Sequence, residues 1–151
     1  MFASPLGPLA LVCNADYITE LHFLSADTTL FAPTTPLATR CVQLLEQYFT
    51  TGKLPKDLPI LPKGTPFQLR VWQALQQIPD GKTKTYGELA KDLQTSARAI
   101  GSACRTNPLP IVIPCHRIVS QRNLGGYMGA TAGECLHNKQ YLLDLENSIA
   151  P

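Results

Sequence analysis

Apolar and polar residues in the first part of the chain follow the two-residue period of β-strands. Residues 9–12 form an apolar run, residues 18–24 alternate between apolar and polar side chains, and the polar segment 14–16 separates them. A β-hairpin is the simplest interpretation. Apolar residues then recur at helical spacing over residues 37–49, and Gly52 ends this pattern, so a helix is predicted there.

The second half of the chain holds more helix signals than the first. Thr65-Pro66 is a typical helix start, and the apolar stripe that follows ends before Pro79. Two further short helices are predicted, over residues 86–93 and from residue 96 through residue 103, with a tight polar turn between them. This arrangement is a candidate helix-turn-helix, with the second helix as the recognition helix.

The last third predicts a strand, a turn and a closing helix. Residues 111–113 are an Ile-Val-Ile run that predicts a buried strand, Gly125-Gly126 predicts a tight turn, and residues 139–146 predict a helix. Residues 128–138 contain glycines and small side chains, and we expect a mobile surface loop there that influences how bulky a substrate is accepted.

Proline-rich connections separate these elements. Residues 27–36 are rich in Thr and Pro, and residues 53–63 hold three prolines. They divide the chain into a predicted N-terminal α/β domain, residues 1–62, and a C-terminal domain, residues 63–151. No apolar run reaches the ~18 residues of a membrane span, and the N-terminus lacks a secretory pattern.

Charge and cysteine content narrow the function classes. Residues 1–59 carry three Lys/Arg against five Asp/Glu, whereas residues 60–151 carry ten against six, and a basic C-terminal half suits a polyanionic partner. The five cysteines are scattered and form no CxxC pair, which argues against a disulfide framework or a four-ligand zinc site. A reducing compartment, cytoplasm or a eukaryotic nucleus, is therefore expected.

A nucleophile is suggested by Cys115, which stands beside His116 directly after Pro114. A free thiol is mostly protonated at neutral pH, and a histidine can accept its proton. The alternative interpretation is a buried cysteine with a polar neighbour, and the dipeptide by itself leaves both open.

The flanking residues resemble a known family. The segment Asn107-Pro108-Leu109-Pro110-Ile111-Val112-Ile113-Pro114-Cys115-His116-Arg117-Ile118-Val119 is similar to the active-site signature of the O6-alkylguanine-DNA alkyltransferases. Further motifs resemble that family in the same order: Gly64-Thr65-Pro66-Phe67-Gln68, Thr85-Tyr86-Gly87-Glu88-Leu89-Ala90, Ala97-Arg98-Ala99-Ile100-Gly101, Leu124-Gly125-Gly126-Tyr127, and Lys139 with Glu146. The resemblance covers residues 64–146 strongly and the N-terminal half weakly.

The resemblance implies an irreversible, single-turnover transfer of the alkyl group from guanine O6 in DNA to Cys115, with O4-alkylthymine left open as a second substrate. His116 would be linked to the thiol through a water and held by Glu146. Asn107 would brace the turn, and Tyr86 would donate a proton to the leaving guanine.

The same resemblance assigns the DNA and pocket residues. Arg98 would fill the space left by a flipped nucleotide, because O6 lies within the duplex and must be extruded to react. The recognition helix would enter the minor groove. The remaining expected contacts are Ser96, Ala97 and Thr85 with DNA, and Tyr86, Ile118, Tyr127, Met128 and Lys139 around the substrate pocket.

By resemblance the fold is α/β, with a small ribonuclease-H-like N-terminal domain and a winged helix-turn-helix C-terminal domain. We expect no cofactor and no metal, double-stranded DNA as the partner, and a monomer in the absence of DNA. Three other classes stay open. A non-catalytic lesion binder would lack the nucleophile, a cysteine hydrolase would turn over, and a transcriptional regulator would prefer a sequence.

Overall fold

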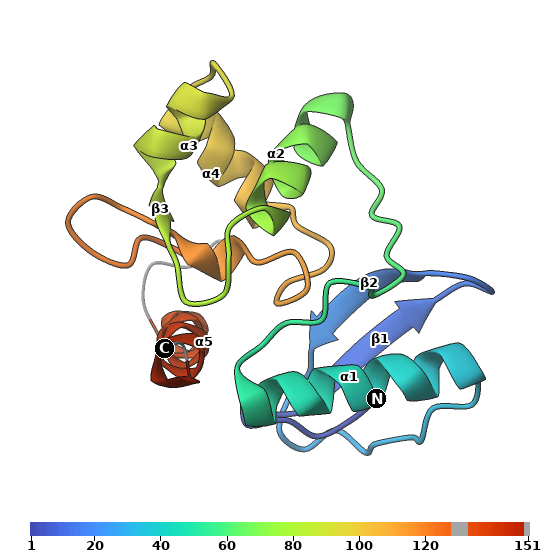
Figure 1. Cartoon of the computed structure of the whole chain (residues 1–151). Coiled ribbons are helices and arrows are strands. Elements are labelled where there is room, and N and C mark those ends of the chain that lie inside the picture. Colours follow the sequence, from blue (N-terminus) through green and yellow to red (C-terminus); the bar gives the residue numbers. More distant parts are fainter. Residues whose placement is uncertain (128–132, 150–151) are drawn as a thin grey trace.

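The computed structural model describes residues 1–127 and 133–149 and has a mixed α/β architecture (Figure 1). The described elements are β1 (Leu9–Cys13), β2 (Ile18–Phe23), α1 (Pro36–Thr51), α2 (Pro66–Gln76), β3 (Lys84–Thr85), α3 (Tyr86–Asp92), α4 (Ala97–Arg105), the short 3-10 helix η1 (Cys115–Arg117), β4 (Ile118–Val119) and α5 (Glu134–Ile149).

The predicted hairpin is confirmed. Strands β1 and β2 pair antiparallel, with Leu9 opposite Phe23. The turn between them is held by the side chain of Asn14, whose Oδ1 accepts the N–H groups of Asp16 (2.9 Å) and Tyr17 (2.8 Å). Figure 1 shows α1 lying along this hairpin, so the two elements cover each other's apolar faces.

Helix α1 begins and ends where local chemistry predicts. The Thr35 hydroxyl accepts the Ala38 N–H at 3.1 Å and caps the N-terminus. At the other end Gly52 adopts φ +70°, a left-handed conformation that glycine tolerates, and its N–H donates to the Tyr48 carbonyl at 2.7 Å. The helix thereby delivers Tyr48 in its last turn to the interior, where its side chain is fully buried.

The proline-rich connection after α1 also takes part in the fold. Ile18 donates its N–H to the Pro59 carbonyl (2.7 Å), and Leu61 donates to the Ile18 carbonyl (2.9 Å). This parallel bridge between Ile18 and Ile60 attaches the connection to the edge of β2 before the chain crosses to α2 (Figure 1).

Helices α2, α3 and α4 form one cluster (Figure 1). Thr65 and Thr85 each open a helix with a capping box, together with Gln68 and Glu88 respectively, and Ser96 caps α4. Helices α3 and α4 are the two short helices expected over residues 86–103, and the pair is fixed to α2 because the Trp72 indole donates to the Ala103 carbonyl at 2.9 Å. Strand β3, directly before α3, and strand β4, after η1, join in a short parallel ladder.

Two predicted elements are wrong. Residues 111–113 form a buried turn and not a strand, because Ile111 takes a left-handed φ of +76° and no neighbouring strand pairs with this run among the described residues. The loop expected over residues 128–138 is wrong for its second part, because α5 begins at Glu134, five residues before the predicted helix start. The first part of that segment, 128–132, lies outside the described residues.

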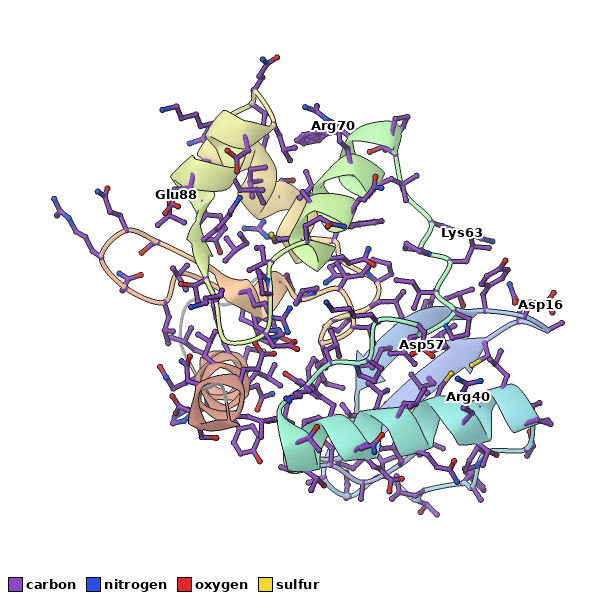
Figure 2. The ribbon with its side chains drawn as sticks, in the orientation of Figure 1. Asp16, Arg40, Asp57, Lys63, Arg70 and Glu88 are labelled. Atoms are coloured by element: carbon purple, nitrogen blue, oxygen red, sulfur yellow. The ribbon has the colours of Figure 1, made fainter. Side chains whose placement is uncertain are left out.

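Most charged side chains lie on the outside. Figure 2 labels exposed examples from both halves: Asp16, Arg40, Asp57, Lys63, Arg70 and Glu88. Against this background, Arg117, Lys139 and Glu146 stand out because all three are buried. Burial of a charge costs free energy unless the charge is paired, so these three buried residues indicate a candidate functional site. None of the described helices is long and apolar enough to cross a membrane.

Candidate active site

A strained, cross-braced turn presents Cys115. Ile111 is fully buried in a left-handed conformation that a β-branched residue rarely adopts. The Asn107 side chain holds this turn from both sides, since its Nδ2 donates to the Ile113 carbonyl (2.8 Å) and its Oδ1 accepts the Leu109 N–H (2.9 Å). The turn therefore has a defined shape up to Pro114, and Cys115 follows as the first residue of η1.

Cys115 faces a cavity of about 950 Å³ between helices α3 and α4 and the loop after β4. The side chain is 4% exposed, so the cavity is its access to solvent. The lining residues are Thr85, Tyr86, Gly87, Ala97, Arg98, Gly101, Ser102, Cys104, Arg105, Cys115, Ser120, Gln121, Gly126 and Tyr127. A thiol, two tyrosines and two arginines in one lining make a site suited to an anionic, aromatic ligand.

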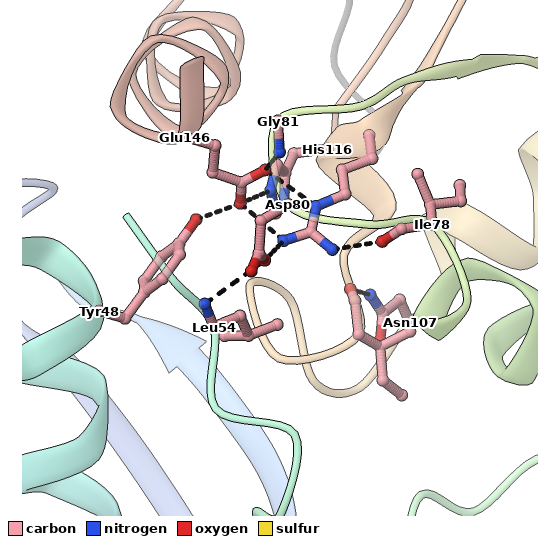
Figure 3. A network of polar contacts seen from close by, with 10 residues as sticks. Tyr48, Leu54, Ile78, Asp80, Gly81, Asn107, His116 and Glu146 are labelled. Atoms are coloured by element: carbon pink, nitrogen blue, oxygen red, sulfur yellow. Dashed lines mark hydrogen bonds and ion pairs between the residues drawn. The ribbon is translucent and has the colours of Figure 1, made fainter. Parts of the chain in front are cut away.

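Behind the thiol, the Glu146 carboxylate collects hydrogen bonds from three side chains (Figure 3). His116 donates from Nε2 to Oε2 at 2.8 Å, and the Tyr48 hydroxyl donates to the same oxygen at 2.5 Å. Arg117 donates from Nε to Oε1 at 2.9 Å and from Nη2 to Oε2 at 3.0 Å. Burial by itself would raise the pKa of Glu146, but the hydrogen bonds from His116 and Arg117 lower it to about 2, so this carboxylate is an anion.

Arg117 continues the network away from Glu146. Its Nη1 donates to the Ile78 carbonyl at 2.6 Å and its Nη2 to the Asp80 carboxylate at 2.5 Å. Asp80 in turn accepts the Leu54 N–H at 3.4 Å (Figure 3). The guanidinium is thus satisfied on all sides and fixes the direction in which Glu146 faces.

His116 has one nitrogen engaged and one free for chemistry. Because Nε2 donates to an anionic carboxylate, the neutral ring carries its proton on Nε2 and a lone pair on Nδ1. Within the described part of the chain, the buried Nδ1 has no protein hydrogen-bond partner. Burial lowers the pKa of His116, so the imidazole is neutral at neutral pH and Nδ1 can accept a proton.

The resting thiol of Cys115 is protonated. Burial raises its pKa to about 11, although a hydrogen bond from Asn107 and the charge of Lys139 oppose this rise. A thiolate is the nucleophilic form, so reaction requires that the proton leave as the substrate binds. The adjacent neutral His116, held by Glu146, is the group equipped to take it.

Lys139 ties the loop after β4 to α5. The buried ammonium donates to the carbonyls of Ile118 (2.5 Å), Leu124 (2.5 Å) and Gly126 (2.9 Å). Burial lowers the pKa of Lys139 to about 8. These hydrogen bonds hold the loop that forms the cavity wall, and Lys139 itself is not among the residues that line the cavity.

Tyr86 stands at the N-terminus of α3, against the glycine turn of that loop. Its hydroxyl lies 3.5 Å from the Gly126 carbonyl, and burial raises its pKa to about 12, so it is a proton donor at neutral pH. At Gly125, which has φ +73°, a Cβ would lie 2.9 Å from the Tyr86 ring. A side chain at position 125 would displace the Tyr86 ring, so this turn requires glycine for the ring to keep its place in the cavity lining.

The exposed face of α4 carries the cations of the cavity edge. Ala97 and Arg98 are exposed in its first turn, and Arg105 is exposed at its last residue. The Ser96 side chain accepts the Ala99 N–H (3.1 Å) and serves as the helix cap, outside the cavity lining. Small residues next to arginine make this face suitable for close approach to a phosphate backbone.

The predicted site residues therefore form two layers. Those that line the cavity are Thr85, Tyr86, Ala97, Arg98, Cys115 and Tyr127, and those packed behind or beside it are Asn107, His116, Ile118, Lys139 and Glu146. Ser96 lies outside both layers, and Met128 lies outside the described residues. In residues 1–127 and 133–149, no three His, Cys, Asp or Glu side chains gather as a metal-ligand set.

Sequence reasoning missed three members of the network: Tyr48, Asp80 and Arg117. Arg117 follows directly on Cys115 and His116, so its position in the motif was a usable signal. Tyr48 lies on the apolar stripe of α1, where the pattern predicts only a core residue, and nothing in the sequence relates it to Glu146, 98 residues away.

Comparison with known proteins gives consistent results. Residues 66–148 match the family described as 6-O-methylguanine DNA methyltransferase, DNA binding domain. A methylated-DNA–protein-cysteine methyltransferase of Methanosarcina acetivorans is 34% identical over 98% of this chain and 97% of its own length, and the constitutive one of Bacillus subtilis is 36% identical over 95% and 91%. The crystal structure of Mycobacterium tuberculosis OGT in complex with DNA superposes with a TM-score of 0.83, at 38% identity over 99% of this chain and 92% of that one.

Proposed function

Because the chain belongs to the 6-O-methylguanine DNA methyltransferase family, we propose that Cys115 is the residue that takes the alkyl group from guanine O6. Membership establishes the class of activity, which is direct-reversal repair of alkylated DNA by transfer to a cysteine of the protein, with DNA as the partner. The convergence of Cys115, Tyr86 and Arg98 on one cavity carries the assignment of residues.

The chemistry follows from the protonation states. The Cys115 proton passes to His116 Nδ1, directly or through the bridging water that the family resemblance implies, and Glu146 stabilises the imidazolium that forms. The thiolate sulfur then forms a bond to the alkyl carbon as the bond from that carbon to guanine O6 breaks. Tyr86 donates a proton to the departing purine, so that a neutral base leaves. The product is a thioether, which water does not displace, and each molecule therefore acts once.

The target must leave the duplex, because an in-line approach to O6 is blocked within the base stack. Arg98 on the exposed start of α4 would occupy the vacated space, while Thr85 and Ala97 on the cavity wall and Ser96 beside it contact the backbone. We propose docking in the minor groove, where the small residues of α4 permit close approach. The bound guanine would lie against Tyr127 and Ile118, and the free protein would be a monomer.

The finer fold description is part of the same proposal. The hairpin with α1 supports a small ribonuclease-H-like domain over residues 1–62. Helices α3 and α4, which lie in the chain between the paired strands β3 and β4, support a winged helix-turn-helix over residues 63–151.

Intact-protein mass spectrometry after incubation with a duplex that contains O6-methylguanine tests the proposal. We expect one methyl group per active molecule, mapped to Cys115, and a burst that reaches a plateau at that stoichiometry. Cys104 lines the same cavity, so Cys104→Ser is the matched control and should keep transfer, whereas Cys115→Ser should bind DNA and transfer nothing. Methyl transfer by Cys115→Ser, or sustained turnover as in a hydrolase, would refute the assignment.

A further inference from the structure

Tyr48 brings the N-terminal half of the chain into the Glu146 network. The residue lies in the last turn of α1, is fully buried, and donates its hydroxyl hydrogen to Glu146 Oε2 at 2.5 Å. The same oxygen accepts His116 Nε2 at 2.8 Å. Figure 3 shows the phenol approaching the carboxylate from α1, on the side opposite the loop that carries Asp80 and Ile78.

A buried tyrosine needs a partner for its hydroxyl, and any buried acceptor would satisfy that need. The acceptor in this protein is the carboxylate that orients His116, so the hydrogen bond acts on chemistry as well as packing. A charge-assisted donor at this distance draws negative charge toward itself. The charge of Oε2 is then divided between Tyr48 and His116.

We propose that Tyr48 is a positioning residue of alkyl transfer, which holds Glu146 Oε2 against His116 and sets the pH below which His116 no longer accepts the Cys115 proton. This inference rests on the proposed role of Cys115 and His116, and it extends the working site from the C-terminal half to α1.

The direction of the effect follows from the groups around the pair. The charged and titratable side chains that face His116 and Glu146 are Tyr48 from α1, Asp80 from the loop after α2, Cys115 and Arg117 from η1, and Lys139 from α5. Removal of the Tyr48 hydroxyl leaves the others in place and leaves more negative charge on Oε2 for His116. The imidazolium gains stability, the pKa of His116 rises, and the neutral base is lost at a higher pH.

The test is the pH profile of the single-turnover rate for full-length Tyr48→Phe on a methylated duplex. The acid limb of this profile is the fall in rate toward low pH. We expect it to move to higher pH by roughly half a unit to one unit, so that transfer is about threefold to tenfold slower near the limb and approaches the wild-type rate at alkaline pH. Burst amplitude counts competent molecules, so partial unfolding lowers the amplitude and leaves the limb unmoved.

Two further variants separate positioning from structure. Val42→Ala removes packing from the same buried face of α1 and leaves the Tyr48 hydroxyl in place for Glu146, so it should lower the melting temperature while the acid limb stays in place. Site-specific 3-fluorotyrosine at position 48 keeps the ring and makes the hydroxyl a stronger donor, so the limb should move to lower pH; this variant also serves if Tyr48→Phe does not fold. A pH-independent loss for Tyr48→Phe, matched by Val42→Ala, or an unmoved limb with fluorotyrosine would overturn the inference. Methyl transfer by Cys115→Ser would instead overturn the proposed function.

Discussion

A carboxylate buried as completely as that of Glu146 would be protonated if it stood alone, because the charged form loses its hydration. It stays ionised because His116, Arg117 and Tyr48 donate to it, and the Gly81 N–H approaches Oε1 at 3.5 Å. The arrangement is sensitive to the loss of any member, since removal of one partner leaves a buried charge uncompensated. At this scale a single side chain couples the reactivity of the site to the stability of the fold.

That coupling predicts a specific acid sensitivity. The pKa of Glu146 is about 2 in the folded protein and 4.5 ordinarily, so its contribution to the free energy of unfolding is complete above pH 4.5 and is lost as pH falls through about 2. The contribution amounts to about 3 kcal/mol. Urea denaturation at a series of pH values should show Glu146→Gln less stable at neutral pH and flatter across this window, whereas exposed Glu46→Gln should follow wild type. Equal pH slopes for wild type and Glu146→Gln would contradict the assignment of the lowered pKa.

At the scale of elements, strong local signals predicted the structure and weak ones did not. The hairpin, α1, α2 and the helix pair were predicted because period, caps and turn residues agree at each of them. Residues 111–113 are β-branched and apolar like a strand, but their burial comes from a turn organised by Asn107, which no local pattern reveals. The first turn of α5 was missed because the glycine-rich residues before it dominate the local composition.

We expect the whole turn around Asn107 to lose its structure when the Asn107 side chain is removed. In Asn107→Ala the Ile113 carbonyl and the Leu109 N–H lose their buried partners, which costs about 2 to 4 kcal/mol in stability. The strained turn should then shift Cys115 and slow transfer in molecules that remain folded. Thermal denaturation and single-turnover kinetics measure the two effects.

Asn14→Ala is the matched control, because Asn14 also braces a turn with its side chain, but on the exposed hairpin far along the chain from Cys115. It should leave the transfer rate unchanged. Full transfer rates in Asn107→Ala would show that the turn tolerates the loss of its brace.

For the whole molecule, the site is a product of both halves. Chemistry-bearing residues in the motif around Cys115 could be predicted because they are adjacent or in a recognisable order, whereas Tyr48 becomes visible only when α1 and α5 are brought together. A second contact between the halves supports the same turn, since Leu21 of β2 donates its N–H to the Pro108 carbonyl at 2.9 Å. Sequence patterns predict which face of a helix or strand is buried. Which two faces pack together across the molecule is known only from the folded structure.

Binding of duplex DNA also involves the whole molecule, and the variant Arg98→Ala tests the proposed role of Arg98 in it. In Arg98→Ala, capture of O6-methylguanine in a duplex should fall more than transfer from free O6-benzylguanine, because a free base needs no replacement in the stack. Exposed Arg122, which is not among the cavity-lining residues, provides a control of equal charge change in Arg122→Ala. Single-turnover rates on both substrates decide the question. Equal losses on the two substrates would assign Arg98 to general phosphate binding or folding.

Helix α5 carries Lys139 and Glu146 seven residues apart. Seven residues of an α-helix amount to nearly two whole turns, so the two side chains leave the same face within about 20°. From that face Lys139 holds the loop that forms the cavity wall, and Glu146 orients His116, the proposed general base. One residue inserted between them would rotate one group by about 100° relative to the other, whereas an insertion before Glu134 would leave their relative phase intact. The placement of both side chains therefore depends on the seven-residue spacing within α5, and not on the length of the chain that precedes the helix.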